Sequence, residues 1–303
     1  MNVYLPIAGQ SVNALVIVVL GFVVGLLSGM FGVGGGFLTT PLLIFYGIPP
    51  TVAVASAATQ ITGASVSGVL VHMRRGGVDL KMGLVMIAGG LLGSFTGAGL
   101  FRLLQSSGQI DVVIGLLYVL ILGWIGILML IDSLKSLGHL PMRSADQPRP
   151  RHNRWVASLP LRWRFHGSGL YISPIAPFAL GFIAGTLTVF LGIGGGFILV
   201  PAMIYLLGMP ARVVIGTSLV MILAVSAATT LIHALTTRAV DMVLAGLLLV
   251  GGVVGAQFGA LLTLRLKPDL VRLALSLIIL LVGLRMFLGL FWHPDEIFSI
   301  EYL

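Results

Sequence analysis

Cysteine is absent from the sequence, which excludes disulfide bonds, thiol redox chemistry and metal sites made of thiolates. Charged residues are scarce: 9% of the 303 residues are Asp, Glu, Lys or Arg, against roughly 25% in a typical soluble domain. Between residues 1 and 73 there are none. The sequence also shows no nucleophile paired with a base and no metal-ligand cluster. We therefore expect a protein that is not an enzyme and that uses no cofactor and no metal.

What the sequence has instead is apolar length. Hydrophobic residues make up 58% of it, and the mean hydropathy is +1.12. Such stretches fit a lipid bilayer, in which each helical span needs about 20 apolar residues. The sequence predicts an all-α polytopic membrane protein with about eight transmembrane segments. They are expected at residues 14–46, 51–72, 82–103, 111–131, 177–207, 211–233, 242–263 and 270–290.

The basic residues are unevenly distributed along the chain. Seven of the 17 lie in the polar segment 133–175, which contains a single acidic residue. By the positive-inside rule this linker is cytoplasmic, where it can touch anionic lipid headgroups. With eight spans, 12 basic residues then fall inside and five outside. No nucleic-acid-binding motif accompanies the arginines, so we expect membrane lipids, and not nucleic acid, as their partners.

The chain reads as two copies of one unit. Residues 31–37, FGVGGGF, match residues 191–197, LGIGGGF, and His72 falls on His233. Internal duplication with paired, glycine-interrupted segments is typical of transporters whose site lies between the repeats. If each first segment crosses the membrane the repeats are parallel, and if it is re-entrant they are inverted; the sequence leaves both open. The expected domains are a first repeat at 1–132, a linker at 133–175, a second repeat at 176–292 and a tail at 293–303.

The triple glycines mark where each first segment is broken. One glycine inside a helix costs about 1 kcal/mol relative to alanine, so three in a row predict an interruption. The helix that resumes near Phe37, or near Phe197 in the second copy, directs its first N–H groups and its positive dipole end at the break. Two such ends can hold a small oxyanion without a lysine. A nucleotide-binding loop is excluded because no lysine follows either run.

Polar residues in the following spans complete the expected site. Ser56, Thr59 and Gln60 recur at three- and four-residue steps, so they share one helical face. Thr217 and Ser218 supply hydroxyls in the second copy, where Met221 takes the place of Gln60. The expected substrate-binding residues are Gly34, Gly35, Gly36, Thr39, Ser56, Thr59, Gln60, Gly194, Gly195, Gly196, Thr217 and Ser218.

Two histidines are the titratable candidates. In the eight-span arrangement, His72 and His233 both sit at the inner ends of equivalent helices. Each is either a neutral, hydrogen-bonded residue at a helix terminus or part of a gate or proton-coupling site. No Asp or Glu lies deep in a span, which argues against a carboxylate proton relay or cation site and favours an anionic substrate.

Glycines also recur at four-residue steps in several spans. Small residues at this spacing are typical of helices that pack closely in a membrane. We expect packing faces at Gly21, Gly25 and Gly29, at Gly89, Gly93 and Gly97, and at Gly251, Gly255 and Gly259.

The residues around the breaks resemble a known family. The stretch GMFGVGGGFLTTPLLIFYGIP, its echo FLGIGGGFILVPAMIYLLGMP and the run VVIGTSL are similar to motifs of the sulfite exporter TauE/SafE family, also called the toluene sulfonate uptake permease group. The resemblance implies a carrier of the bacterial inner membrane for sulfite, sulfoacetate, sulfonates or other organic anions. It implies binding roles for both glycine runs and for Thr217 and Ser218. The first copy departs from the GTSL run, because VASAA at 54–58 keeps only the hydroxyl of Ser56.

The sequence therefore predicts a secondary transporter that exports a small organosulfur anion or sulfur oxyanion held between the two repeats. No ATPase motif is visible, and an anion leaving a negative-inside cell gains roughly 2.3 kcal/mol per charge per 100 mV. Two alternatives stay open: an anion channel, and an uptake permease for a different organic anion. Assembly into a homodimer is also open.

Overall fold

The computed structural model describes residues 2–31, 36–74, 76–136, 160–165, 167–263 and 268–291. Helices dominate these residues, and six of them are long and apolar enough to cross a membrane, fewer than the eight expected spans. These six are α3 (Pro50–Arg74), α4 (Leu80–Ser106), α5 (Ile110–Ser136), α9 (Ala211–Thr236), α10 (Met242–Thr263) and α11 (Pro268–Phe291). The shorter apolar helices are α1 (Ala14–Phe31), α2 (Gly36–Phe45), α7 (Ile175–Leu191) and α8 (Gly196–Tyr205).

Two small β-hairpins depart from the expected all-α fold. Strand β1 (Asn2–Leu5) pairs antiparallel with β2 (Gln10–Asn13), and β3 (Trp163–Phe165) pairs antiparallel with β4 (Leu170–Ile172). Strands of three or four residues are too short to show a reliable alternation of apolar and polar residues. The β3–β4 hairpin lies within the predicted linker 133–175, of which residues 137–159 lie outside the described ranges.

The chain divides into two compact units. The smaller unit comprises residues 111–142 and 267–303 and contains α5 and α11. Within it, the small residues of α5 let side chains of α11 approach, as where Leu290 lies beside Gly115 and Leu280 beside Gly126. The larger unit comprises residues 1–110 and 143–266 and contains the other helices and both hairpins. The candidate site lies entirely in the larger unit.

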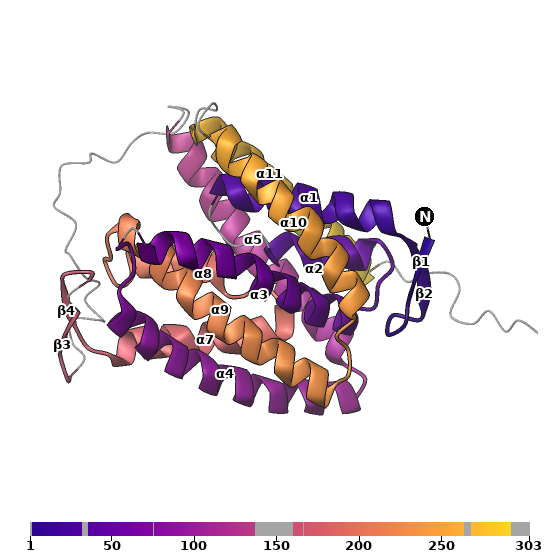
Figure 1. Ribbon diagram of the computed structural model, residues 1–303, viewed down its shortest axis with the longest axis horizontal. Coiled ribbons are helices and arrows are strands. Elements are labelled where there is room, and N and C mark those ends of the chain that lie inside the picture. Colours follow the sequence, from indigo (N-terminus) through magenta and orange to yellow (C-terminus); the bar gives the residue numbers. More distant parts are fainter. Residues whose placement is uncertain are drawn as a thin grey trace, which may run out of the picture. The chain divides into compact units, whose positions relative to one another are not determined.

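In the larger unit, α3 and α9 lie side by side, α1 packs along α10, and α4 packs along α7 (Figure 1). In the outer pairs, α1 with α10 and α4 with α7, the two helix backbones are in direct contact at glycines. A Cβ atom placed on Gly25 would overlap the backbone of Gly252, and one on Gly93 would overlap the backbone of Phe182. The prediction that the four-residue glycine rows are packing faces is confirmed.

Contacts along the outer pairs fix the directions of their helices. On α4, Gly89 lies against Phe178 and Gly97 against Thr186, so the contact positions rise together and α4 runs parallel to α7. Helix α1 is parallel to α10 for the same reason. Gly21, Gly25 and Gly29 lie in order against Leu248, Gly252 and Ala256.

The central helices run in opposite directions. Thr59 of α3 is hydrogen-bonded to Thr230 of α9, whereas Gly68 lies against Leu219, so α3 and α9 are antiparallel. The expectation that His72 and His233 lie at the same side of the protein is therefore wrong. Each lies in the last turn of its helix, and the two helices run in opposite directions.

Helix α8 runs back along the bundle after α7 ends. On α4, Gly83 faces Thr217 and Gly90 faces Val225, which makes α4 parallel to α9. Because α7 is also parallel to α4, α7 and α9 point the same way, and the chain must return between them. The break after α7 lies beside Ile222, at mid-length of α9. The ten residues of α8, about 15 Å of helix, nearly match the about 17 Å of α9 that precede Ile222.

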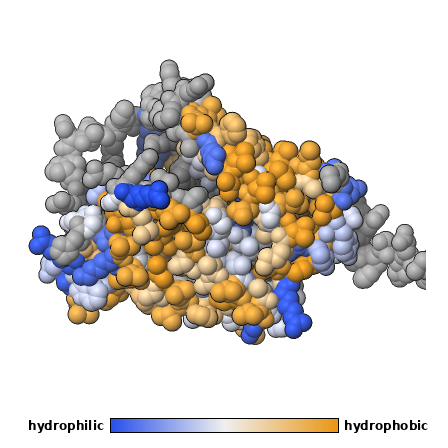
Figure 2. Space-filling view, in the orientation of Figure 1, coloured by the Kyte–Doolittle hydropathy of each residue, from blue (hydrophilic) through white to orange (hydrophobic). Residues whose placement is uncertain are grey.

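The outer surface of these helices is apolar. Leu84, Phe95 and Leu103 on α4 are more than half exposed. The face shown in Figure 2 is mostly hydrophobic over the helices, with hydrophilic residues at the β3–β4 hairpin. A surface of this kind is stable against lipid tails and not against water. The structure and the composition thus agree on a multi-pass membrane protein.

Candidate functional site

A pocket of about 280 Å³ lies in the larger unit between α1, α3, α9, α10 and the first residue of α2. The volume falls just below the roughly 300–1,000 Å³ of sites for drug-sized ligands, so it suits a small solute. Small residues leave this space between the helices: Gly25, Gly29, Ala64, Gly68, Gly252 and Ala256. The polar contributions come from Ser28, Gly36, Gln60, Ser65 and His72.

The pocket carries no full charge. Its lining, taken over the described residues, includes no Asp, Glu, Lys or Arg, and its remaining members are the aliphatic Val24, Ile61, Ile215 and Leu219. A polar solute in this space would be held by hydroxyl, amide and backbone groups and by helix dipoles. Such groups are individually weak but become effective where water is excluded.

The start of α2 forms one end of the pocket. Helix α1 ends at Phe31 and α2 begins at Gly36; the predicted residues Gly34 and Gly35 lie outside the described ranges. Gly36 is buried and lines the pocket. The first N–H groups of a helix have no acceptor within it, and the dipole makes this end positive. A Cβ on Gly36 would overlap the side chain of Ile61, so a larger residue here would displace Ile61.

Gln60 is the most informative polar side chain of the pocket. It is 5% exposed, and its Nε2 donates a hydrogen bond to the carbonyl of Leu248 at 3.4 Å. Its Oε1 is buried and has no hydrogen-bond partner among the described residues. Leaving a buried polar atom unpaired costs about 1–3 kcal/mol, so the position needs a reason beyond stability. Its amide nitrogen also has a second N–H beyond the one used by Leu248.

The predicted convergence of the two resumed helices is visible in their phenylalanines. The rings of Phe37 on α2 and Phe197 on α8 stack with centroids 4.4 Å apart and an interplanar angle of 6°. The first turns of α2 and α8 are therefore adjacent. Beside them, Thr40 donates to the carbonyl of Leu191, and the buried Thr39 hydroxyl has no partner among the described residues.

The second break is fully described. Helix α7 is closed by Gly192, and Gly194 and Gly195 have φ of 65° and 72°, in the left-handed region that glycine adopts without strain. Gly196 then opens α8. None of these residues lines the pocket, which lies on the α2 side of the stacked rings.

Ser56 and Thr217 hold the backbone of two buried aspartates. The Ser56 hydroxyl accepts the N–H of Asp241 at 3.3 Å, and the Thr217 hydroxyl accepts the N–H of Asp79 at 2.9 Å. Both hydroxyls lie outside the pocket lining. Local spacing places them on the expected helical faces, but their partners lie 185 and 138 positions away in the sequence.

Each aspartate caps a helix and holds a hairpin. Asp79 accepts the N–H of Met82 at the start of α4, and both the N–H and the hydroxyl of Ser168 in the β3–β4 turn, at 2.8 and 2.9 Å. Asp241 accepts two N–H groups at the start of α10, and the N–H of Ile7 in the β1–β2 turn at 3.1 Å. Both carboxylates are therefore occupied by these hydrogen bonds, and neither aspartate lines the pocket.

Two further predicted hydroxyls bond within their own helices. Ser218 donates to the carbonyl of Ile215, and Thr59 donates to the carbonyl of Ala55. Neither residue lines the pocket. Of the predicted set, the pocket brings together Gly36 and Gln60, with His72 at the same helix face.

The two histidines differ in their surroundings. His72 lines the pocket. His233 is 1% exposed, with Nε2 3.1 Å from the carbonyl of Val189 and Nδ1 3.3 Å from the Thr237 hydroxyl. Its ring also meets Phe101 edge to face. The geometry of His233 is that of a hydrogen-bonded core residue, whereas His72 belongs to the pocket lining.

Sequence reasoning missed Ser28, Ser65 and Gly252, which line the pocket from three helices. A signal was present for α3. Gln60, Ala64, Gly68 and His72 follow one another at four-residue steps, so small residues separate two polar ones on one face. The pocket residues of α1 and α10 carried no such signal, because glycines such as Gly25 and Gly252 both line the pocket and pack the two helices together.

Comparison with known proteins identifies the family. The model of the sulfite exporter TauE/SafE family matches residues 17–286, which is most of the chain. The chain belongs to the TauE/SafE family. A probable membrane transporter protein of Xylella fastidiosa is 29% identical over 268 residues, covering 87% of this chain and 91% of that protein.

Other relatives match the chain over most of its length or over a short segment. The probable membrane transporter protein YunE of Bacillus subtilis is 27% identical, covering 88% of this chain and 95% of that protein. The sulfite exporter TauE/SafE family protein 6 of Arabidopsis thaliana is 46% identical over 52 residues, 17% of this chain and 12% of that protein. No solved structure matches the chain. The chain is thus a multi-pass membrane protein of a transporter family.

Proposed function

We propose that this protein is a secondary transporter for a small oxyanion and that the pocket beside Gly36 and Gln60 is its substrate site. The observation that carries the proposal is the helix N-terminus at Gly36 beside the buried amide nitrogen of Gln60, both at a small space whose described lining has no charged side chain. A site without carboxylates disfavours a cation. The positive end of α2 favours an anion.

Four residues of the pocket offer neutral donors to such an anion. They are the first N–H groups of α2 at Gly36, the second N–H of Gln60, and the hydroxyls of Ser28 and Ser65. His72 could add a ring N–H. Hydrogen bonds to a charged group contribute about 1.5–3 kcal/mol each, so two or three suffice for reversible binding. A weaker hold than a lysine would give is useful to a carrier, because the substrate must also leave.

The helix directions support two inverted repeats. In each repeat, the long helices cross the membrane, whereas α2 and α8 return after α1 and α7 and present their N-termini near mid-membrane. With six crossings and the linker inside, 14 basic residues fall on the cytoplasmic side and three on the other, namely Arg102, Arg238 and Arg285. This asymmetry exceeds the 12 to five obtained with eight spans, which favours the inverted arrangement.

The hairpins agree with this topology. Asp79 follows α3 and binds the β3–β4 turn, whereas Asp241 follows α9 and binds the β1–β2 turn. Figure 1 shows the two hairpins at opposite ends of the bundle formed by α3, α4, α7 and α9. In the proposed topology the β3–β4 hairpin is cytoplasmic and the β1–β2 hairpin is on the far side of the bacterial inner membrane.

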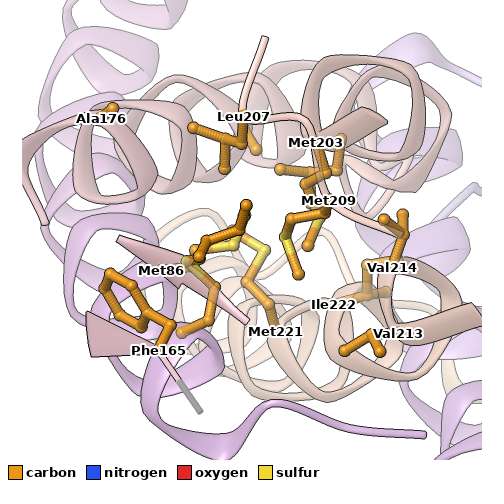
Figure 3. Close-up of a cluster of buried hydrophobic side chains, with 14 of the residues drawn as sticks. Met86, Phe165, Ala176, Met203, Leu207, Met209, Val213, Val214, Met221 and Ile222 are labelled. Atoms are coloured by element: carbon orange, nitrogen blue, oxygen red, sulfur yellow. The ribbon is translucent and has the colours of Figure 1, made fainter. Parts of the chain in front are cut away.

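One chain holds one open site under this proposal, although the repeat has two copies. On the second side, larger residues stand where the pocket has small or polar ones: Val189 for Gly29, Thr229 for Gly68 and Met221 for Gln60. Met221 is fully buried in an apolar cluster with Met86 (Figure 3). The equivalent space is filled by side chains instead of being open.

We propose sulfite, sulfoacetate or a related sulfonate as the substrate, in the direction of export, because the pocket is small, neutral and suited to oxyanions. The test uses purified protein in detergent and in proteoliposomes. A thermal-shift series with sulfite, sulfate, sulfonates and small carboxylates identifies the ligand, since a ligand that binds the native state raises its melting temperature. Counterflow of the labelled ligand then distinguishes a carrier from a channel. If no oxyanion stabilises the protein, the proposal is wrong.

A further inference from the structure

Two hydroxyls on α9 are buried without a partner. Ser226 and Thr229 are each 0% exposed, and neither Oγ nor Oγ1 has a hydrogen-bond partner among the described residues. Hydroxyls inside a helix commonly donate to the carbonyl four residues earlier, as Thr62 and Thr188 do. Ser226 and Thr229 lie on one face of α9, and each unpaired buried hydroxyl costs about 1–3 kcal/mol of stability. A ligand that bonds to them would account for this cost.

One of these hydroxyls, that of Ser226, lies at the second glycine break, and Thr229 follows it by three residues on α9. The Ser226 Oγ is 3.1 Å from the point where a Cβ on Gly194 would stand. The missing side chain therefore leaves bare backbone facing the hydroxyl. Helix α8 starts two residues later, and its N-cap, Gly195, has no side chain to satisfy the first N–H groups. The start of α8 and the unpaired Ser226 hydroxyl thus meet at the same point.

A single side chain separates this point from the open pocket. Ile61 lines the pocket and touches Gly36 through its Cδ1, while its Cγ2 lies 2.9 Å from the Cβ position of Gly194. Ile222, its counterpart on α9, lies 2.9 Å from the same position. A path from the pocket to Gly194 on this side would therefore require the Ile61 side chain to move.

We propose that Gly194, Ser226 and Thr229 form a second binding position for the transported oxyanion, entered from the pocket past Ile61. The inference rests on the proposed transport function and adds the next step of the path. In the described conformation the first position is open and the second is closed. The inverted repeat then gives each side of the membrane its own position, with Ile61 and Ile222 between them.

The first test removes the two hydroxyls while keeping their shapes. In the double variant Ser226→Ala and Thr229→Val, we expect the melting temperature without ligand to stay the same or rise, because unpaired buried groups disappear. Sulfite binding at the open pocket should stay within about twofold, whereas flux in proteoliposomes should fall at least about tenfold for loss of one hydrogen bond to a charged group. The matched control is Thr96→Val, whose hydroxyl bonds its own helix at an exposed position. Unchanged flux in the double variant overturns the proposal.

The second test uses the absence of cysteine from the chain. A single Ser226→Cys variant is treated with a thiosulfonate reagent that carries a sulfonate, and Ser65→Cys in the open pocket serves as the positive control. We expect slow labelling at position 226, faster labelling when Ile61→Ala is added, and protection in both by sulfoacetate, which unlike sulfite does not react with the thiosulfonate reagent. If position 226 stays unreactive with Ile61→Ala while position 65 reacts, the second position does not exist. Absence of sulfite binding or flux in the wild-type protein would instead refute the proposed function itself.

Discussion

The substitution Gln60→Met examines the proposed site by giving position 60 the residue that stands at the matching sequence position, Met221. The two side chains have similar length and volume, and Met221 shows that methionine is tolerated at the equivalent place. The change removes the donor N–H groups and the unpaired Oε1 together, and leaves Ser28, Ser65 and the start of α2 in place.

The expected effects on binding and on stability have opposite signs. Loss of one hydrogen bond to an anion costs about 1.5–3 kcal/mol, which weakens binding roughly 10- to 150-fold. Without ligand, the variant loses the bond to Leu248, about 0.5–1.5 kcal/mol, and regains the about 1–3 kcal/mol that the buried Oε1 costs. We therefore expect a melting temperature equal to or above that of the wild-type protein, together with weak or undetectable anion binding.

The assay is a titration of the best ligand from the thermal-shift series, followed by isothermal calorimetry on both proteins. Gln105→Met, an exposed glutamine near the end of α4, is the control for the substitution itself. An anion affinity within twofold of wild type would refute the assignment of the pocket. A large loss of stability would refute the argument that the Gln60 amide is kept for binding at a cost to the fold.

Two further predictions concern the scaffold. Asp79→Ala should lower the free energy of unfolding by the about 0.5–2 kcal/mol of a helix cap, plus the cost of the unpaired N–H of Ser168, and so lower the melting temperature. The exposed Asp132→Ala should have little effect, and equal melting curves for the two variants would show that the cap does not matter. Gly25→Ala should destabilise the protein by about 1–3 kcal/mol, because a Cβ there overlaps the backbone of Gly252. The control Gly99→Ala, whose Cβ faces open space, should be neutral or stabilising. Thermal unfolding in detergent measures both, and a less stable Gly99→Ala than Gly25→Ala would contradict the packing of α1 on α10.

The sequence allowed the helices to be placed because lipid imposes their length and composition. The expected segment 82–103 corresponds to α4, and the expected break at Gly194 to the end of α7. It did not allow the direction of α8 to be read, since a ten-residue apolar helix looks alike whether it continues or returns. That direction depends on contacts such as those of Gly83 with Thr217, which join residues far apart in the chain.

The candidate site was predictable where one helix carries it. Gln60 was found because its spacing from Ser56 and Thr59 puts the three on one face, and His72 was found as a titratable residue that matches His233. Ser56 has the same spacing as Gln60, yet its hydroxyl serves the backbone of Asp241. The difference arises from what packs against each side of α3, which no local pattern encodes. Ser28 and Gly252 entered the pocket for the same reason, through the pairing of α1 with α10.

The pairing of α1 with α10 has a consequence for biosynthesis. Gly21 meets Leu248, so α1 is made about 230 residues before its partner. At roughly 5–20 residues per second, α1 waits on the order of ten to forty-five seconds in the bilayer with its glycine face uncovered. A face of this kind pairs readily with any helix that has a similar row. During that interval the nascent protein depends on the insertion machinery to keep α1 from the wrong neighbour, and the α4–α7 pair, which closes after about 90 residues, forms first.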